Sequence, residues 1–147
     1  LFRSPKCPKY MAMDLGHLGQ AQKHFESSLD ALQEFACEEW EKQWRMAILK
    51  LNIARLDFKM GNMLKAKEGF LQVIIICEKL KRKDVLFGAH LRLAEVEMAL
   101  GNIEQALRHV MESHKGFTEL GMTRDLELAE QLMEDIETKK SQHLEQQ

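Results

Sequence analysis

The sequence contains few residues that break helices, with 2 prolines and 8 glycines among 147 residues. A chain so poor in these residues has little room for long irregular loops. Runs of β-branched residues are also scarce, whereas Leu, Ala, Glu, Lys, Gln and Met, which favour helix, are abundant. The composition therefore predicts an all-α fold.

Cysteine is scarce as well, and the 3 cysteines, Cys7, Cys37 and Cys77, lie far apart in the sequence. Their number is odd and no Cys-x-x-Cys pair occurs, so neither a zinc site nor a disulfide framework is indicated. Cys37 and Cys77 fall in predicted helices, where a small buried thiol is the expected role. This usage indicates a reducing compartment, and we expect a cytoplasmic protein, with the nucleus as the alternative.

A strong net charge and long apolar runs are absent too. The formal net charge is −2, whereas nucleic-acid binding usually requires a clustered basic surface. The short basic run at 79–83 is interpreted as a solvated helix end. The apolar run at 73–77 is far shorter than the roughly 18 residues of a membrane span. We therefore expect neither a nucleic-acid partner nor membrane insertion. Because the chain begins with Leu and shows no secretory signal, we expect a fragment or a processed product.

Patterns typical of catalysis are not found in the sequence. The 6 histidines show no His-Glu-x-x-His spacing, and no cysteine has a histidine at a spacing typical of a nucleophile and its base. Gly16 and Gly19 are not followed by the Lys-Ser of a phosphate-binding loop. We therefore predict that the protein is not an enzyme and that it has no catalytic residue, no metal and no cofactor.

The sequence does contain three similar segments, at 15–25, 60–70 and 100–110. Each has a large apolar residue, a Gly, a polar residue and another apolar residue, followed by an Ala and, four residues later, a bulky apolar residue. Their glycines lie 45 and then 40 residues apart. A period of about 20 to 50 residues is typical of stacked-repeat proteins, which usually bind partners on an extended surface. The equivalent residues are Gly16, Gly61 and Gly101; Ala21, Ala66 and Ala106; and Phe25, Phe70 and Val110.

Each repeat is predicted to be a pair of antiparallel helices. In the second repeat, a helix runs from about residue 38 or 41 to Met60. Gly61 can adopt the left-handed conformation that ends a helix, and Asn62 can cap the next one. Gly101 and Asn102 repeat this arrangement. The small alanines would let the two helices approach closely, and the bulky residues beside them would fill the remaining space.

These residues resemble the tetratricopeptide-repeat (TPR) family, over about residues 9–122. The resemblance concerns the longer variety of about 40 residues and implies a right-handed α-α superhelix of antiparallel helix pairs. The sequence departs from the family pattern at Asp57 and Glu97, which stand where the first helix usually has an aromatic residue. The matching positions are Leu15, Gly16, Ala21 and Phe25; Met60, Gly61, Asn62, Ala66 and Phe70; and Leu100, Gly101, Asn102, Ala106 and Val110.

The resemblance divides the chain into six parts. We expect an irregular segment, a first and truncated repeat, two full repeats, a capping helix that starts near Thr123 or Asp125, and a polar tail that frays. These parts cover residues 1–8, 9–37, 38–83, 84–122, 123–137 and 138–147, respectively.

In such a stack, the first helices of successive repeats line a concave groove. This implies a non-catalytic adaptor or scaffold that binds a peptide or helix of a partner protein. The alternative for the apolar members is packing against an adjacent helix. For the whole chain, the alternative is a structural subunit of a multi-subunit complex whose groove is permanently filled, and a ligand-sensing domain is a third interpretation. The groove residues are Asn52, Arg55, Phe58, Lys59, Arg92, Glu95 and Met98.

Two further features are candidate binding sites. Trp40 and Trp44 share a helix face, and they either pack an extended helix or form a second partner-binding surface. Some TPR proteins clamp an acidic carboxy terminus with five side chains. Asn52 and Arg92 match that pattern together with Lys6, but Tyr10 and Gly88 do not. Without both ends of the clamp, a carboxylate would meet too few donors.

Overall fold

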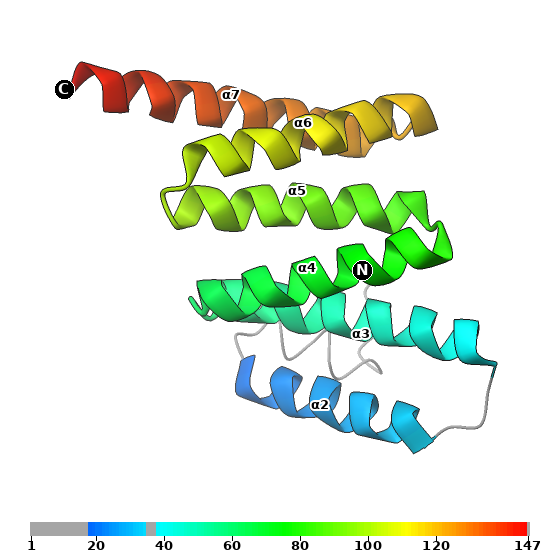
Figure 1. Ribbon diagram of the computed structural model, residues 1–147. Helices are drawn as coiled ribbons and strands as arrows, with labels where there is room; N and C mark the ends of the chain where they lie inside the picture. The colour runs from blue at the N-terminus through cyan, green and yellow to red at the C-terminus, as the bar shows by residue number, and fades with distance from the viewer. Residues whose placement is uncertain (1–17, 35–37, 147) are drawn as a thin grey trace, which may run out of the picture.

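The computed structural model describes residues 18–34 and 38–146 as a single stack of helices (Figure 1). Within these residues there are six helices and no strand, and each helix packs against its neighbour in the chain. The prediction of an all-α fold of neighbouring antiparallel helices is confirmed. The helices are α2 (Leu18–Glu34), α3 (Glu39–Lys59), α4 (Met63–Leu80), α5 (Lys83–Ala99), α6 (Ile103–Leu120) and α7 (Thr123–Glu145).

The core is divided into clusters that follow the stack. One cluster of buried side chains joins α3, α4 and α5, and a second joins α5, α6 and α7, so α5 contributes to both. The predicted alanines Ala21, Ala66 and Ala106 are fully buried, which confirms their role at the helix contacts. At Gly69 α4 approaches α3 closely, since an added Cβ would lie 2.8 Å from the Cβ of Ala54. Burial of this apolar surface is what stabilises helices of this length.

Four turns between helices have the same hydrogen-bonding pattern. Within residues 18–34 and 38–146, the residues with positive φ are at positions 61, 81, 101 and 121, each 20 residues after the one before. At the first turn the N–H of Asn62 donates to the carbonyl of Asp57 (2.8 Å) and the N–H of Gly61 donates to that of Phe58 (3.1 Å). This is the Schellman arrangement, which satisfies the last carbonyls of a helix. The left-handed conformation predicted for Gly61 and Gly101 is confirmed.

The capping role predicted for Asn62 and Asn102 is wrong. Each is the N-cap residue of the next helix, but neither side chain makes a capping hydrogen bond. The Nδ2 of Asn102 instead donates to Oε1 of Glu97 (3.4 Å), and the side chain of Asn62 hydrogen-bonds Asp57 in the same way. The reason is that an acidic residue lies five residues before each asparagine. The asparagine side chain hydrogen-bonds this acid across the turn and is therefore not available to cap the next helix.

Lys81 has φ of 58° at the end of α4, where the other three turns have glycine. A side chain in this conformation costs about 1–2 kcal/mol. We expect Lys81→Gly to raise the free energy of unfolding by about 0.5–1 kcal/mol, after the greater freedom of glycine in the unfolded chain is subtracted. Urea unfolding measures the change. Lys79→Gly, inside α4, is the matched control and should lose about 1 kcal/mol. Equal losses in both variants would contradict the prediction.

The last helix is longer than predicted. It begins at Thr123 with Met122 as its N-cap residue and continues to Glu145, so the helix expected over 123–137 includes most of the segment expected to fray. Ala129 and Ile136 are buried against α6, whereas residues 137–146 are almost all exposed. Figure 1 shows the last turns of α7 extending beyond the end of α6. The irregular segment expected at 1–8 and the start of the truncated repeat expected at 9–37 lie outside the described residues.

Candidate functional site

Five of the seven predicted groove residues line one cleft between α3 and α5. The cleft has a volume of about 140 Å³. Its sixth lining residue, Phe70, comes from α4, which packs between these two helices. The lining residues are Arg55, Phe58 and Lys59 of α3, Phe70 of α4, and Arg92 and Glu95 of α5.

The cleft combines positive charge with aromatic side chains. Three of its side chains are cationic, Arg55, Lys59 and Arg92, and one is anionic. Glu95 accepts from Nη1 of Arg92 at 3.2 Å through Oε1 and at 3.4 Å through Oε2, and both side chains keep partial contact with water. Phe70 is buried, so its ring lies below the charged groups. An anionic side chain placed next to an apolar one would find complementary groups here.

Two predicted groove residues are outside this cleft. Asn52 is half-buried on α3 and does not line the cleft. Met98 packs against the buried cluster of α5, α6 and α7, as the alternative for the apolar residues proposed. Phe58 does both, since it lines the cleft and packs against the cluster of α3, α4 and α5. Of the acidic-tail clamp, Lys6 and Tyr10 lie outside the described residues.

Phe70 was not predicted to line the cleft. It was identified as the bulky residue that follows Ala66 in the repeat, and it does fill the core next to α3 and α5. It nevertheless also lines the cleft, from below. Its position on α4 could have indicated this role, because α4 packs between α3 and α5, the two helices that were expected to line the groove.

The two tryptophans have different environments. Trp40 is 60% exposed near the start of α3. Trp44 is half-buried, packs against the core and carries the guanidinium of Arg82 over its ring, with Cζ 3.8 Å from the ring centroid. Such a cation–π contact is worth about 0.5–1 kcal/mol at an exposed site. Trp44 therefore has a packing role, and Trp40 is the member of the pair that a partner can reach.

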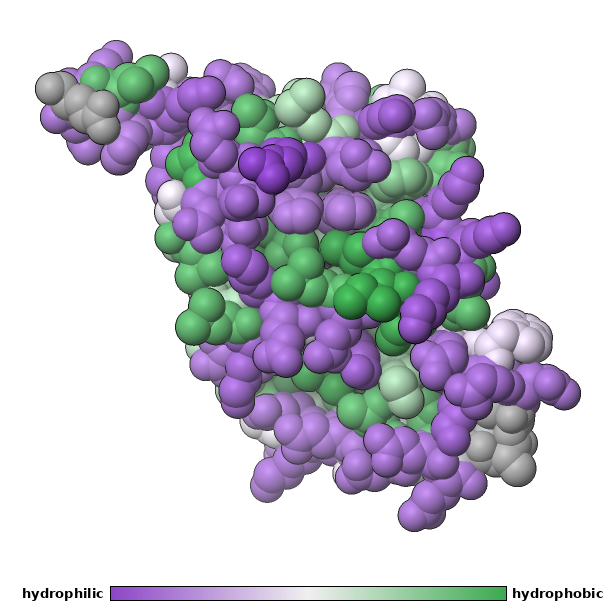
Figure 2. All heavy atoms as spheres, viewed as in Figure 1, coloured by the Kyte–Doolittle hydropathy of each residue, from purple (hydrophilic) through white to green (hydrophobic). Residues whose placement is uncertain are grey.

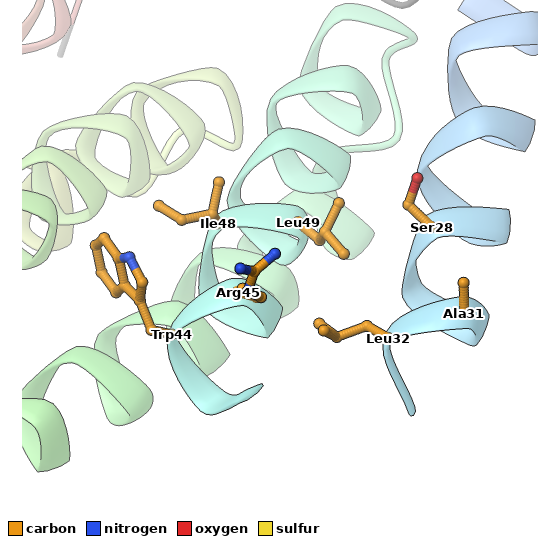
Figure 3. Close-up of a pocket in the computed structure, with 7 residues that line it drawn as sticks. All are labelled: Ser28, Ala31, Leu32, Trp44, Arg45, Ile48 and Leu49. Atoms are coloured by element: carbon orange, nitrogen blue, oxygen red, sulfur yellow. The ribbon is translucent and has the colours of Figure 1, made fainter. Parts of the chain in front are cut away.

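Trp44 also lines a larger hollow of about 460 Å³ at the start of α3. Figure 3 shows Leu32 on α2 and Leu49 on α3 pointing toward one another, while Trp44 and Ile48 extend from the side of α3 away from α2. The wall is mostly apolar, with Arg45 in front, where its Nη2 pairs with Oε1 of Glu41 at 2.9 Å.

Exposed apolar side chains also occur on α4. In Figure 2 apolar side chains gather in the middle of the visible face, over α4 and α5, with polar side chains around them. On α4 the exposed large residues are Leu64 (74% exposed), Leu71 and Ile75. These three lie seven and four residues apart, which places them on one side of the helix.

Two acidic residues are buried at equivalent positions, just before the turns at Gly61 and Gly101. Glu97 is 2% exposed and pairs with Nζ of Lys67 at 3.3 Å. Asp57 is buried too, and loss of hydration raises its pKa, although the hydrogen bond from Asn62 and the charge of Lys65 act in the opposite direction. The TPR pattern has an aromatic residue at these two positions. In this protein the pairs Asp57–Asn62 and Glu97–Asn102 instead link the ends of α3 and α5 to the turns that follow them.

The remaining candidate chemistry is limited. Cys77 is fully buried, as expected, and burial raises the pKa of its thiol to about 11. Cys7 and Cys37 lie outside the described residues. Within residues 18–34 and 38–146, no three His, Cys, Asp or Glu side chains are grouped to hold a metal ion, and no helix is long and apolar enough to cross a membrane. The basic run at 79–83 lies at the end of α4 and is largely exposed, as predicted.

Comparison with known proteins identifies the fold. No family model matches the sequence, and no curated protein sequence matches it. Among solved structures, the crystal structure of BtubC (BKLC) from P. vanneervenii is similar, with a TM-score of 0.67 and 19% sequence identity over 77% of this chain. The chain spans 44% of the length of that protein. The similarity shows that the protein has an all-α fold of packed neighbouring helices.

Proposed function

We propose that this protein is a non-catalytic interaction module that binds an acidic peptide or helix of a partner protein in the cleft between α3 and α5. The observation that carries the proposal is the convergence of Arg55, Lys59 and Arg92 above Phe70. The cations come from two helices that are separated in the sequence by α4, so the cleft depends on the fold. A buried ring next to cationic groups is typical of the centre of a protein interface.

We further propose that the stack is a member of the TPR superfamily in its longer form and that it works in the cytoplasm or nucleus. The antiparallel neighbours, the buried alanines at equivalent positions and the glycine turns all support this assignment. In that family, first helices face the groove, which agrees with the place of the cleft between α3 and α5.

The test is quantitative capture of partners from cell lysate with the wild-type chain and with Arg55→Glu/Arg92→Glu. Hydrogen bonds to charged groups contribute about 1.5–3 kcal/mol each, so the loss of two should weaken a partner's binding about 100-fold or more. Arg124→Glu/Lys139→Glu is the matched control, because it makes the same charge change on exposed positions of α7. Circular dichroism must first show that all three proteins are folded.

Partners lost only with the Arg55/Arg92 variant would support the cleft as the binding site. Equal loss with the α7 control would attribute binding to net charge. Partners retained by every variant would move the binding surface elsewhere, with Trp40 as the first position to test.

The second candidate is a structural subunit whose contacts are permanent. The exposed apolar residues of α4, Leu64, Leu71 and Ile75, favour it, because contiguous apolar surface usually marks an interface. A subunit isolated from its complex should self-associate, whereas an exchangeable adaptor should be monomeric. Light scattering at two protein concentrations distinguishes the two.

A further inference from the structure

His90 of α5 and His109 of α6 face one another across the helix contact. Their Nδ1 atoms are 3.1 Å apart. The ring centroids are 5.3 Å apart, and the ring planes differ by 29°. With the two Nδ1 atoms 3.1 Å apart, this is nearly the largest possible separation of the centroids. The rings therefore meet edge to edge through these nitrogens, and each lone pair points at the other ring. That direction suits an N–H···N hydrogen bond, whereas two ligands of one metal ion would point to a common position beside the line that joins them.

A bond of this kind needs one proton between the two nitrogens. In the neutral pair, one ring carries its proton on Nδ1 and donates, and the other carries its proton on Nε2 and accepts. A first added proton goes to the free Nε2 of the donor ring, and the N–H···N bond remains as an imidazolium–imidazole bond. A second added proton has only the accepting Nδ1 left, and two N–H groups would then point at each other.

The surroundings favour the neutral rings, because burial outweighs the nearby charges. The charged groups that act on the pair are Glu97 of α5, Arg108 and Glu112 of α6, and Lys67 of α4. Two are acidic and two are basic, so their effects largely offset one another. Burial is the largest influence on both rings, and it lowers the pKa of His90 and of His109 from the ordinary value of 6.5.

We propose that the His90–His109 contact is an acid-sensitive latch between α5 and α6, which keeps its hydrogen bond after one added proton and opens on the second. The latch is independent of the proposed partner-binding function, because it concerns the contact of two helices and not the cleft.

The sign of the pH effect follows from proton counts. The unfolded chain takes up protons on both rings as the pH falls below about 6.5, whereas the folded chain takes them up at lower pH. The unfolded state therefore binds more protons in that window, and stability is fully present above pH 6.5 and lost as the pH falls through the folded-state pKa values. The folding equilibrium constant falls about tenfold for each pH unit between a folded-state pKa and its unfolded value.

The test is a titration of the histidine ring nitrogens by NMR in the full chain, combined with urea unfolding between pH 7.5 and 5.0. We expect the two rings to titrate together in two coupled steps, with loss of stability in the acid range. His109→Asn is the informative variant, since an amide at this position can donate to His90 when it is neutral and accept from it when it is protonated. In that variant His90 should titrate in one step and the loss of stability in acid should fall by at least half.

His24→Asn is the matched control, because His24 is exposed on α2, and it should keep the wild-type profile. Independent single steps for His90 and His109 near pH 6.5 would overturn the proposal. Equal effects of His24→Asn and His109→Asn on the loss in acid would also overturn it. The titration of the wild-type chain gives the decisive result even if His109→Asn folds poorly.

Discussion

Replacing Gly116 by alanine should lower the free energy of unfolding by about 2 kcal/mol, although alanine is the better helix former. Gly116 is buried in α6, and a Cβ at this position would overlap Cγ and both Cδ atoms of Phe87 on α5. The overlap is at the root of the ring, so rotation of the ring alone does not relieve it. Phe87 is also held edge to face against Phe117, with centroids 6.4 Å apart. Overpacking at the upper end of the usual range, about 3 kcal/mol, outweighs the gain of about 1 kcal/mol from helix propensity.

Gly88 is the matched control for this substitution. It lies inside α5, and an added Cβ would have no neighbour within 4 Å. Gly88→Ala should therefore raise the free energy of unfolding by about 0.5–1 kcal/mol. Urea unfolding of both variants measures the contrast, and the double variant Phe87→Ala/Gly116→Ala should lose less than the sum of its two single changes. If Gly116→Ala is as stable as Gly88→Ala, the contact between α5 and α6 is looser than described.

Lys67→Met is expected to produce a loss of similar size, about 2 kcal/mol. The substitution keeps an apolar stem next to the core but removes the ammonium that lies 3.3 Å from Oε1 of the buried Glu97. Removing one member of a buried ion pair typically costs about 3–5 kcal/mol, because the other charge remains without a counter-charge. The lysine side chain is 35% exposed, so water screens part of this effect and the lower figure applies. Thermal and urea unfolding at neutral pH provide the measurement.

The reverse substitution, Glu97→Gln, should cost less than half as much. The amide keeps an oxygen for the side chain of Asn102, and Lys67 can turn toward water. The asymmetry is the informative result, since a surface ion pair would give two small and similar losses. Equal losses from both substitutions would show that Glu97 does not depend on Lys67 for its charge balance.

Much of the fold could be predicted because it depends on local patterns. A left-handed residue at a helix end favours glycine, so Gly61 and Gly101 identified their turns in the sequence. The turn at Lys81 could not be identified in this way. Lys81 adopts the same left-handed conformation, but a lysine in the sequence does not indicate it. The asparagines were misinterpreted for a related reason. Capping by Asn is a common local motif, whereas the preference of Asn102 for Glu97 depends on an acid that folding buries.

The candidate site was partly predictable for a geometrical reason. Residues three or four apart lie on one helix face, so Arg55 goes with Lys59 on α3 and Arg92 goes with Glu95 on α5. That both pairs face one groove was implied by the resemblance to the TPR family. Which of their neighbours are covered by another helix depends on tertiary packing. Met98 follows the same spacing, yet it packs among residues of α6 and α7. Periodicity locates a face, and it does not show how far along the face the next helix extends.

The even spacing of the left-handed residues has a mechanical consequence. Positions 61, 81, 101 and 121 divide the stack into lengths of 20 residues, each of which touches mainly the helix before and the helix after it. Under tension such a stack gives way one helix at a time, because each helix is held mainly by its nearest neighbours. Each helix that detaches and unravels would release about 70 Å of extended chain. The stack would then lengthen in steps of nearly constant size and act as a short molecular spring.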